Sequence, residues 1–559
     1  MDRSEELADS ILLGEVITLD ANSTIAEAVA VAGGRIIAAG SAKDVLGRSD
    51  GNTEIHDFGD AAIIPGFNDT HAHMDTEGMK LVHPPLTGCR SIADVTARIG
   101  ALAAETPLGN WVVTMPVGEP PHYFGGPEIL EEARMPTRDE LDHAAPDHPV
   151  CILPPSGYWG KPPCYMALNS RALALNGIGK ETEPSLLGIE ILKDETGEPT
   201  GVFVDNNPRE AAQLDLMAAV PRFALDDRRE AVAQAMQLYH TKGTTSIYEG
   251  HGCSPDVIGI YRDLWQSGRL TMRVGLVLSP PWSAAAEAEA VMRDWLAFAR
   301  GHGLGDEWLK ISGVYIDYGG DPVAAEKARA RANDTGYWSF HWLANTPEEF
   351  EALCMAAARY DLRVHTIASA GKQRDILPVL ARVDAAFGIS GRRWVLEHLS
   401  LSDPEDLEEM KRLGLGVTLI PRHHLWKNGA TFFDLGDAES AHVVPAKQLR
   451  ELGIPFAAGT DNTPFNPLAV MESLIERTER VSGRLVGEDG RISAEAALRS
   501  LTTDGAWLTF DENVKGRLAA GQLADCAVLS ENPLKTEPGA LQQIECLATM
   551  VGGKFVFGA

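Results

Sequence analysis

The stretch PGFNDTHAHMD, residues 65–75, does more than any other part of the chain to decide its fold class. It follows the apolar run AAII and places His71 and His73 two residues apart. Residues i and i+2 of a strand point to the same side, so two imidazoles at this spacing converge on one point, as a metal ion requires. By itself the pair is also compatible with two surface histidines after a Pro-Gly turn. The pattern around it decides between the two interpretations.

The middle of the chain alternates between helical and strand-like segments. Ala-rich helical stretches such as REAVAQAMQLYHTKG (229–243) and PEEFEALCMAAARYDLR (347–363) are separated by short apolar runs such as MRVGLVL (272–278) and LGVTLI (415–420). Alternating β and α units indicate a parallel sheet. So many units in so long a chain favour a closed (β/α)8 barrel of the TIM type, and in this context the histidine pair indicates a metal site.

The two ends of the chain resemble each other and differ from the middle. Both are rich in short β-branched runs punctuated by glycine, such as EAVAVAGGRIIAAG near the start and CLATMVGGKFVFG near the end. We therefore expect a small β-sandwich domain built from residues 1–64 and 511–559. The barrel is expected over 65–463, with an insertion at about 105–215, and its last helices over 464–510.

Charge and composition narrow the classes of partner. The 559 residues carry a formal net charge of −30, which repels phosphate backbones and makes nucleic acid an unsuitable partner. The seven cysteines are scattered and form no C-x-x-C, so neither a disulfide framework nor a thiolate zinc site is indicated. No apolar run approaches the roughly 20 residues that cross a bilayer, and the polar, acidic start lacks the features of a signal peptide. These observations predict a cytoplasmic protein that acts on a small molecule and not at a membrane.

Three further metal-ligand candidates each follow a strand-like run. His365 follows DLRV, His398 follows RWVLE, and Asp461 follows IPFAAGT. The C-terminal ends of the strands are the face on which barrels of this type carry their active sites. Each of these residues alone is typical of a core histidine or a turn aspartate. Together with the first pair, they occupy equivalent positions around one ring.

At this point the sequence resembles the amidohydrolase superfamily, and within it the branch that contains N-substituted formamide deformylase. AIIPGFNDTHAHM (62–74) is similar to the strand-1 motif of the family, and LRVHTIA, WVLEHLS and FAAGTDNTPFNPL are similar to its later ligand strands. The segments LNSRALALNGI and GEPTGVFVDN resemble an insertion typical of this branch. VKGRLAAGQLADCAVLSENP resembles the return of the chain to the β domain.

The resemblance implies a ligand set and a reaction. His71, His73 and Asp461 would bind one divalent metal, His365 and His398 would bind a second, and Asp461 would also be the general base. The metal would be zinc, as one or two ions, with iron or manganese as alternatives. The implied reaction is hydrolysis of a C–N bond in an amide, formamide or cyclic amide by a metal-activated water. The family also implies a homodimer.

The chain departs from the family pattern at three places. The family bridges two metals with a carboxylated lysine, and Tyr315 stands at that position in EWLKISGVYIDYGG. Lys310 lies an odd number of residues earlier, which turns it to the opposite face of a regular strand unless a bulge intervenes. The site then holds one metal, or two metals bridged by water with or without the phenolate. Ala368 and Ser369 replace a Gly-Asp pair, and Cys164 replaces a histidine of the insertion.

Four residues are candidates for substrate contact. They are Tyr315, the adjacent pair His423 and His424 after the run LGVTLI, and Glu249 in SIYEGHG. The alternative for the histidine pair is an exposed loop. Asp69, which precedes the first histidine pair, is expected to accept a hydrogen bond from a ligand imidazole.

Two other functions remain open from the sequence. Three histidines with carboxylates also suit non-haem iron, so an oxygenase on the same scaffold is the first alternative. A partner subunit with a degraded site is the second, because of the departures near Tyr315.

Overall fold

The structure of the chain, a computed structural model, describes residues 6–155, 160–207, 211–221, 224–279, 285–330 and 346–559. Its centre is a barrel of eight strands, and consecutive barrel strands pair in parallel. The barrel strands are β5 (Phe67–Asp69), β11 (Thr244–Cys253), β12 (Arg273–Leu278), β14 (Leu309–Tyr315), β15 (Val364–Ile367), β16 (Val395–Glu397), β17 (Gly416–Leu419) and β18 (Phe456–Ala458). The (β/α)8 fold expected from the alternating pattern is therefore confirmed.

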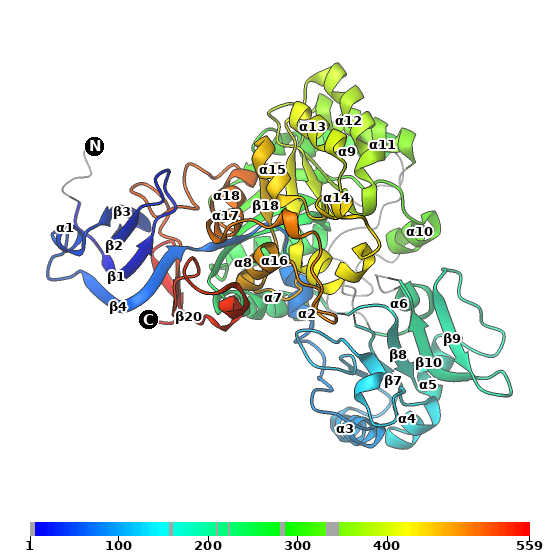
Figure 1. Cartoon of the computed structure of the whole chain (residues 1–559). Helices are drawn as coiled ribbons and strands as arrows, with labels where there is room; N and C mark the ends of the chain where they lie inside the picture. The colour runs from blue at the N-terminus through cyan, green and yellow to red at the C-terminus, as the bar shows by residue number, and fades with distance from the viewer. Residues whose placement is uncertain (1–5, 156–159, 208–210, 222–223, 280–284, 331–345) are drawn as a thin grey trace.

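Helices surround the barrel, as Figure 1 shows. They are α2 (Met74–Met79), α7 (Leu225–His240), α8 (Pro255–Gln266), α9 (Ala285–Asp294), α10 (Pro322–Ala330), α11 (Pro347–Arg359), α12 (Gln373–Phe387), α13 (Pro404–Leu413), α14 (Asp437–Ser440), α15 (Ala446–Leu452), α16 (Pro467–Glu476), α17 (Ala494–Ser500) and α18 (Thr503–Leu508). Local sequence sets their ends. The capping box of Thr346 and Glu349 with Pro347 begins α11, and Gly414, at φ 64°, ends α13.

The barrel closes where its first strand, β5, meets its last, β18, and we call this junction the closing seam. The carboxylate of Asp69 accepts hydrogen bonds from the N–H of Thr460 at 2.9 Å and from its hydroxyl at 2.6 Å. The N–H of Asp461 donates to the carbonyl oxygen of His71 at 2.8 Å. Asp69 thus joins the two strands, and the expectation that it accepts from a ligand imidazole is wrong, because Thr460 takes that place.

A glycine makes the closing seam possible. A Cβ on Gly459 would lie 2.5 Å from the backbone nitrogen of His71, closer than real Cβ atoms approach. Any side chain there would push β18 away from β5.

The two ends of the chain build one small β domain, as expected. Its seven strands form a sheet in the order β21-β20-β19-β4-β1-β2-β3, at the left in Figure 1. They are β1 (Ser10–Ile17), β2 (Ile25–Ala32), β3 (Arg35–Gly40), β4 (Glu54–Pro65), β19 (Cys526–Leu529), β20 (Cys546–Val551) and β21 (Lys554–Phe557), with α1 (Ala42–Leu46) following β3. Strand β4 pairs in parallel with β1 and antiparallel with β19, so it joins the N-terminal and C-terminal parts.

The insertion forms a third sheet, at the lower right of Figure 1, in the order β6-β7-β8-β10-β9. Its elements are α3 (Ile92–Glu105), β6 (Val112–Thr114), α4 (Arg138–Ala144), β7 (Val150–Ile152), β8 (Cys164–Leu168), α5 (Ser170–Leu175), β9 (Ile189–Lys193), β10 (Pro199–Asp205) and α6 (Ala211–Leu216). The strands lie inside the expected range of 105–215, whereas α3, which packs on α4, precedes it. In the parts of the chain that the structure describes, no helix is both long and apolar enough to cross a membrane.

A buried ion pair attaches the β domain to the barrel. Arg273, at the start of β12, donates to both carboxylate oxygens of Asp525, at 2.6 and 3.0 Å, and both side chains are about 95% buried, with side-chain exposures of 4% and 5%. Removal of one partner from such a pair leaves an uncompensated buried charge, which costs far more than the loss of an exposed pair.

We expect Asp525→Ala to destabilise the protein by about 3–5 kcal/mol, because the Arg273 guanidinium would remain buried without its carboxylate. Thermal and urea unfolding measure the effect. Glu351→Ala is the control, since its partner Arg382 is about half exposed, and it should change stability by less than about 1 kcal/mol. Equal effects of the two substitutions would contradict the assignment of Arg273–Asp525 as the attachment.

Candidate metal centre

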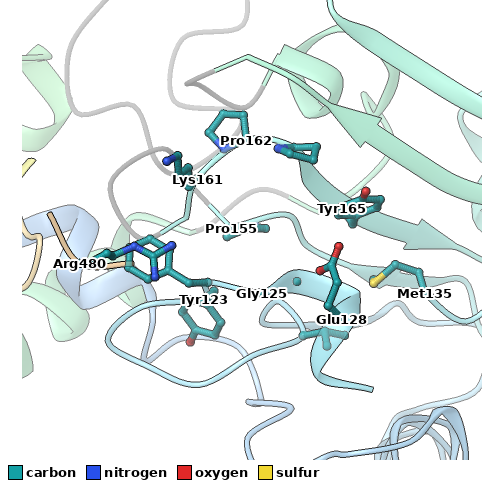
Figure 2. Close-up of a pocket in the computed structure, with 13 residues that line it drawn as sticks. Tyr123, Gly125, Glu128, Met135, Pro155, Lys161, Pro162, Tyr165 and Arg480 are labelled. Atoms are coloured by element: carbon teal, nitrogen blue, oxygen red, sulfur yellow. The ribbon is translucent and has the colours of Figure 1, made fainter. Parts of the chain in front are cut away.

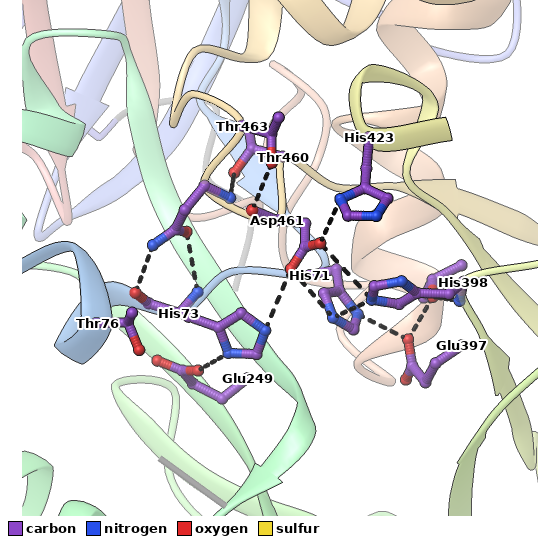
Figure 3. Close-up of polar contacts among 12 residues, drawn as sticks. His71, His73, Thr76, Glu249, Glu397, His398, His423, Thr460, Asp461 and Thr463 are labelled. Atoms are coloured by element: carbon purple, nitrogen blue, oxygen red, sulfur yellow. Dashed lines mark hydrogen bonds and ion pairs between the residues drawn. The ribbon is translucent and has the colours of Figure 1, made fainter. Parts of the chain in front are cut away.

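Three side chains from three strand ends converge at the C-terminal mouth of the barrel. His71 follows β5, His398 follows β16, and Asp461 follows β18; all three are buried. One donor atom from each lies within 4.8 Å of the other two, which makes this trio a candidate metal site within the described residues. Figure 3 shows the three side chains pointing toward one another.

The distances around Asp461 are those of groups that can share one ion. His71 Nε2 and His398 Nε2 lie 2.8 Å apart. Asp461 Oδ1 lies 3.3 Å from His73 Nε2, and Asp461 Oδ2 lies 3.6 Å from His423 Nδ1. Metal–nitrogen distances of about 2.0–2.1 Å in a tetrahedral site separate neighbouring donors by roughly 3.3 Å. Small movements would therefore bring this set onto one cation.

Buried polar atoms without hydrogen bonds also fit a metal ion. Both carboxylate oxygens of Asp461, Nδ1 of His423 and Nε2 of His424 make no hydrogen bond of good geometry to any residue that the structure describes. Burial of such groups without a partner is costly, and native proteins satisfy nearly all of them. A divalent cation would supply what these donor atoms lack, so the residues present fit the group that the fold implies.

Two of the converging residues have unusual backbone conformations. His398 has φ +59° and Asp461 has φ +48°, both in the left-handed region that non-glycine residues rarely adopt. Each costs about 1–3 kcal/mol, and such strain concentrates at functional sites. In both cases the conformation turns the side chain at the end of a strand toward the mouth of the barrel.

The electrostatics keep Asp461 ionised. Burial alone would raise the pKa of its carboxyl, but the neighbouring rings of His398, His73 and His71 lower it to about 2. Burial in turn lowers the pKa of His424 to about 4 and that of His398 well below its usual range. His73 is the exception, because Asp461 and Glu249 outweigh its burial and raise its pKa to about 10.

Glu397 organises the site, and the sequence analysis missed it. Its Oε2 lies 3.0 Å from His71 Nδ1 and its Oε1 lies 2.6 Å from His365 Nδ1, while the Thr418 hydroxyl also donates to it. Burial opposes its ionisation, but the two histidines hold its pKa well below the usual range. With the proton of His71 on Nδ1, Nε2 presents a lone pair to the cluster. A buried carboxylate next to a predicted ligand, His398, was the available signal.

His365, expected as a ligand, is not brought to the cluster. Its Nδ1 donates to Glu397, and its Nε2 accepts from the Tyr248 hydroxyl at 2.9 Å. Burial lowers the pKa of His365 to about 4, so the ring is neutral and both nitrogens have protein partners. The expected second metal therefore lacks this ligand in the arrangement seen here.

Glu249, expected to contact substrate, lies behind His73. Its Oε2 lies 3.2 Å from His73 Nδ1, and its Oε1 accepts from the N–H of Met74 at 3.1 Å and from the Tyr261 hydroxyl at 2.6 Å. It is 1% exposed. The geometry makes it the residue that orients His73, as Glu397 orients His71.

Gly250 allows the close approach of His71 and Glu397. A Cβ on Gly250 would lie 2.9 Å from Nδ1 of His71 and 3.0 Å from Oε1 of Glu397. A side chain there would disturb the hydrogen bond between the two.

The strand that carries Tyr315 and Lys310 answers the question left open by the sequence. Tyr315 pairs in register with His365, is fully buried, and donates from its hydroxyl to Asp317 at 3.2 Å. Lys310 donates instead to Asp511 Oδ1 at 2.7 Å and to the Thr509 carbonyl oxygen at 2.8 Å. Lys310 is thus a structural residue that holds the C-terminal segment, although a register shift in β14 lies between it and Tyr315 and removes the basis of the odd-offset argument.

The histidine pair after β17 lies at the cluster and not in an exposed loop. His423 and His424 belong to a π-helical turn, Arg422–Lys427, a conformation that recurs at functional sites. The ring centroids of His423 and His424 lie 6.2 and 5.8 Å from that of His398. Contact with substrate stays a prediction for both.

A (β/α)8 barrel with histidines and an aspartate converging at its strand ends has the architecture of metal-dependent hydrolases. The model of the amidohydrolase family matches residues 54–557, and the chain belongs to this family.

One relative and two solved structures illustrate the range of similarity. N-substituted formamide deformylase of Arthrobacter pascens is 24% identical over 97% of each chain. An uncharacterized metal-dependent hydrolase of Pyrococcus horikoshii has the same fold, with a TM-score of 0.68 and 20% identity over 95% of this chain and 99% of that one. The zinc complex of atrazine chlorohydrolase from Arthrobacter aurescens, at 15% identity, has a TM-score of 0.51 over 98% of this chain and 95% of that one.

We expect Glu397→Gln to weaken the binding of divalent metal by about 10- to 100-fold, because the amide accepts from only one of the two imidazoles that the carboxylate now orients. Competition with a chromophoric chelator measures the affinity. Glu408→Gln, on the exposed face of α13, is the control and should bind metal normally. Wild-type affinity in Glu397→Gln would contradict the role assigned to this residue.

Proposed function

We propose that this protein hydrolyses the C–N bond of a small amide, formamide or cyclic amide through a metal-activated water. The observation that carries the proposal is the buried trio of His71, His398 and Asp461, with both Asp461 oxygens lacking a well-aligned hydrogen bond in the described structure. Membership of the amidohydrolase family supports the reaction class.

Each residue of the site has a definable role in this reaction. A divalent ion held by these residues would lower the pKa of a water and polarise the scissile carbonyl. Asp461, ionised because its pKa is about 2, accepts a proton at its carboxylate and transfers it to the leaving nitrogen. His423, which is partly exposed and lies 3.6 Å from Asp461, contacts the substrate. Glu397 and Glu249 keep the imidazoles of His71 and His73 oriented throughout.

We further propose a single ion, with zinc as the first choice and iron or manganese as alternatives. Its ligands would be His71, His398 and Asp461, with His73 at the edge of the group. Two observations support one ion over two: Tyr315 stands where a bridging lysine is expected, and both nitrogens of His365 already have partners. Element analysis of the purified protein tests this. Iron with oxygen uptake in place of hydrolysis would favour the oxygenase alternative.

Assembly and location remain proposals. We expect a homodimer in the cytoplasm, acting on a small molecule and not on nucleic acid; the net charge of −30 supports the last point. Light scattering on the purified chain tests the dimer. A monomer with full metal content and activity would refute it.

We expect N-substituted formamides to be the most productive first substrates, since a relative that is similar over 97% of both chains carries that activity in its name. Hydrolysis should stop on removal of metal by a chelator and return when the native ion is added back. Measurement of released amine and formate follows both steps. Turnover that persists in metal-free protein would exclude the mechanism.

We expect Asp461→Asn to lower kcat by about 10²- to 10⁴-fold, because the amide cannot accept the proton. Asp489→Asn, which changes an exposed carboxylate outside the cluster, is the matched control and should be fully active. Metal content is determined for both variants, so that loss of a ligand is separated from loss of the base. A fully active Asp461→Asn variant would rule out Asp461 as the base.

A further inference from the structure

A cavity of about 240 Å³ lies between the insertion and the barrel (Figure 2). Its walls include Tyr123, Phe124 and Tyr165 from the insertion and Arg480 from the segment after α16. A water molecule occupies about 30 Å³ in the liquid, so the cavity has room for about eight waters, or for one ring with a small substituent. Its aromatic walls suit an apolar occupant.

One end of the cavity is cationic. Figure 2 shows Lys161 and Arg480 on the same side, away from Glu128 at the other end. The Arg480 guanidinium lies over the Phe124 ring at 4.2 Å, and its Nε is buried without a hydrogen-bond partner in the described structure. Neither Arg480 nor Lys161 has a carboxylate within 4 Å among the residues that the structure describes. The nearby carboxylate of Glu479 accepts from both the N–H and the hydroxyl of Ser482.

Two buried cations nearby have carboxylate neighbours. Lys80 Nζ lies 2.7 Å from Glu77 Oε1, and Arg422 Nη1 lies 3.8 Å from Glu472 Oε1. Arg480, which is partly exposed, has no such neighbour in the described structure, so its guanidinium is available to an anion in the cavity.

His122 packs on Phe124, close to several cations. Its ring stacks on Phe124 with centroids 4.8 Å apart. Burial, and then the positive charges of Lys80, Arg422, Lys427 and Arg480, lower its pKa to about 3. Four cations therefore act on the ring that packs against Phe124.

Lys427 connects the cavity wall to the metal centre. It belongs to the same π-helical turn as His423, and its Nζ lies 5.8 Å from the Phe124 ring. Burial lowers its pKa to about 8, with Asp461 acting against the shift and Arg480 adding to it. Lys427 thus links the turn that carries His423 to the Phe124 wall of the cavity.

We propose that this cavity binds the carboxylate-bearing aromatic end of the substrate, with the carboxylate between Arg480 and Lys161 and the ring against Phe124 and the two tyrosines. Glu128 repels a carboxylate from the opposite end and so fixes the orientation. The inference rests on the proposed function only in taking the occupant to be the substrate. The charge-assisted hydrogen bonds of Arg480 give it specificity over neutral analogues.

Calorimetric titration of the metal-containing protein with benzoate and with benzamide tests the proposal without turnover. We expect benzoate to bind at least about tenfold more tightly than benzamide, a difference that charge-assisted hydrogen bonds can supply. Arg480→Gln should lose this preference, Lys161→Gln should reduce it, and Arg480→Lys should restore part of it. Any benzoate bound to the metal itself contributes equally to all variants.

Arg484→Gln is the matched control, since Arg484 follows Arg480 by four residues but lies over the Phe433 ring at 3.9 Å and does not line the cavity. It should bind both probes as the wild type does. Circular dichroism of each variant verifies folding, and Lys161→Gln keeps the test valid if Arg480→Gln misfolds, because Lys161 is exposed.

The proposal would be overturned if the wild type bound benzoate and benzamide equally, or bound neither. It would also be overturned if benzoate binding were unchanged in both Arg480→Gln and Lys161→Gln. Inorganic phosphate that binds as tightly as benzoate, with the same dependence on Arg480, would overturn it too, because it would indicate a plain anion site. Benzoate binding that depends on Arg480 in a protein that hydrolyses no amide would refute the proposed function and leave this site standing.

Discussion

The closing seam between β5 and β18 is the constraint on which the site depends. Asp69 on the first strand holds Thr460 after the last, and just beyond these residues the N–H of Asp461 donates to the carbonyl oxygen of His71. Closure of the barrel and approach of two donor groups are therefore one event. Gly459 permits it, because any side chain there would collide with His71.

Acidic and basic side chains lie on different sides of the site. Glu397 and Glu249 lie behind the histidines of the H-x-H pair and fix their rings, so the negative charge of the barrel interior serves orientation. On the side of the insertion the charge reverses, with Arg480 and Lys427 beside Phe124. A substrate with a carboxylate far from its amide would place the carboxylate beside the positive charges of Arg480 and Lys427. Its uncharged amide would then lie at the acidic interior of the barrel.

The sequence was informative about which residues follow each barrel strand. Strand periodicity explains less: His71 and His73 both lie within 4 Å of Asp461 Oδ1 although β5 ends at Asp69, and a register shift in β14 lies between Lys310 and Tyr315. The sequence could not show that Glu397 would join His71 to His365, or that Tyr248 would occupy the second nitrogen of His365. Those contacts depend on the registers of strands that are distant in the chain. The cavity depends on how the insertion packs on the barrel, which no local pattern encodes.

The pairing of β4 with both β1 and β19 has a consequence for biosynthesis. Strand β4 emerges from the ribosome early, but its neighbour β19 is made only after the whole barrel and the insertion. At about 5–20 residues per second, this delay is on the order of half a minute or more. During that time one edge of β4 remains open to strands of other nascent chains. The β domain is thus the last to be completed, and translation that stops early would leave its central strand exposed.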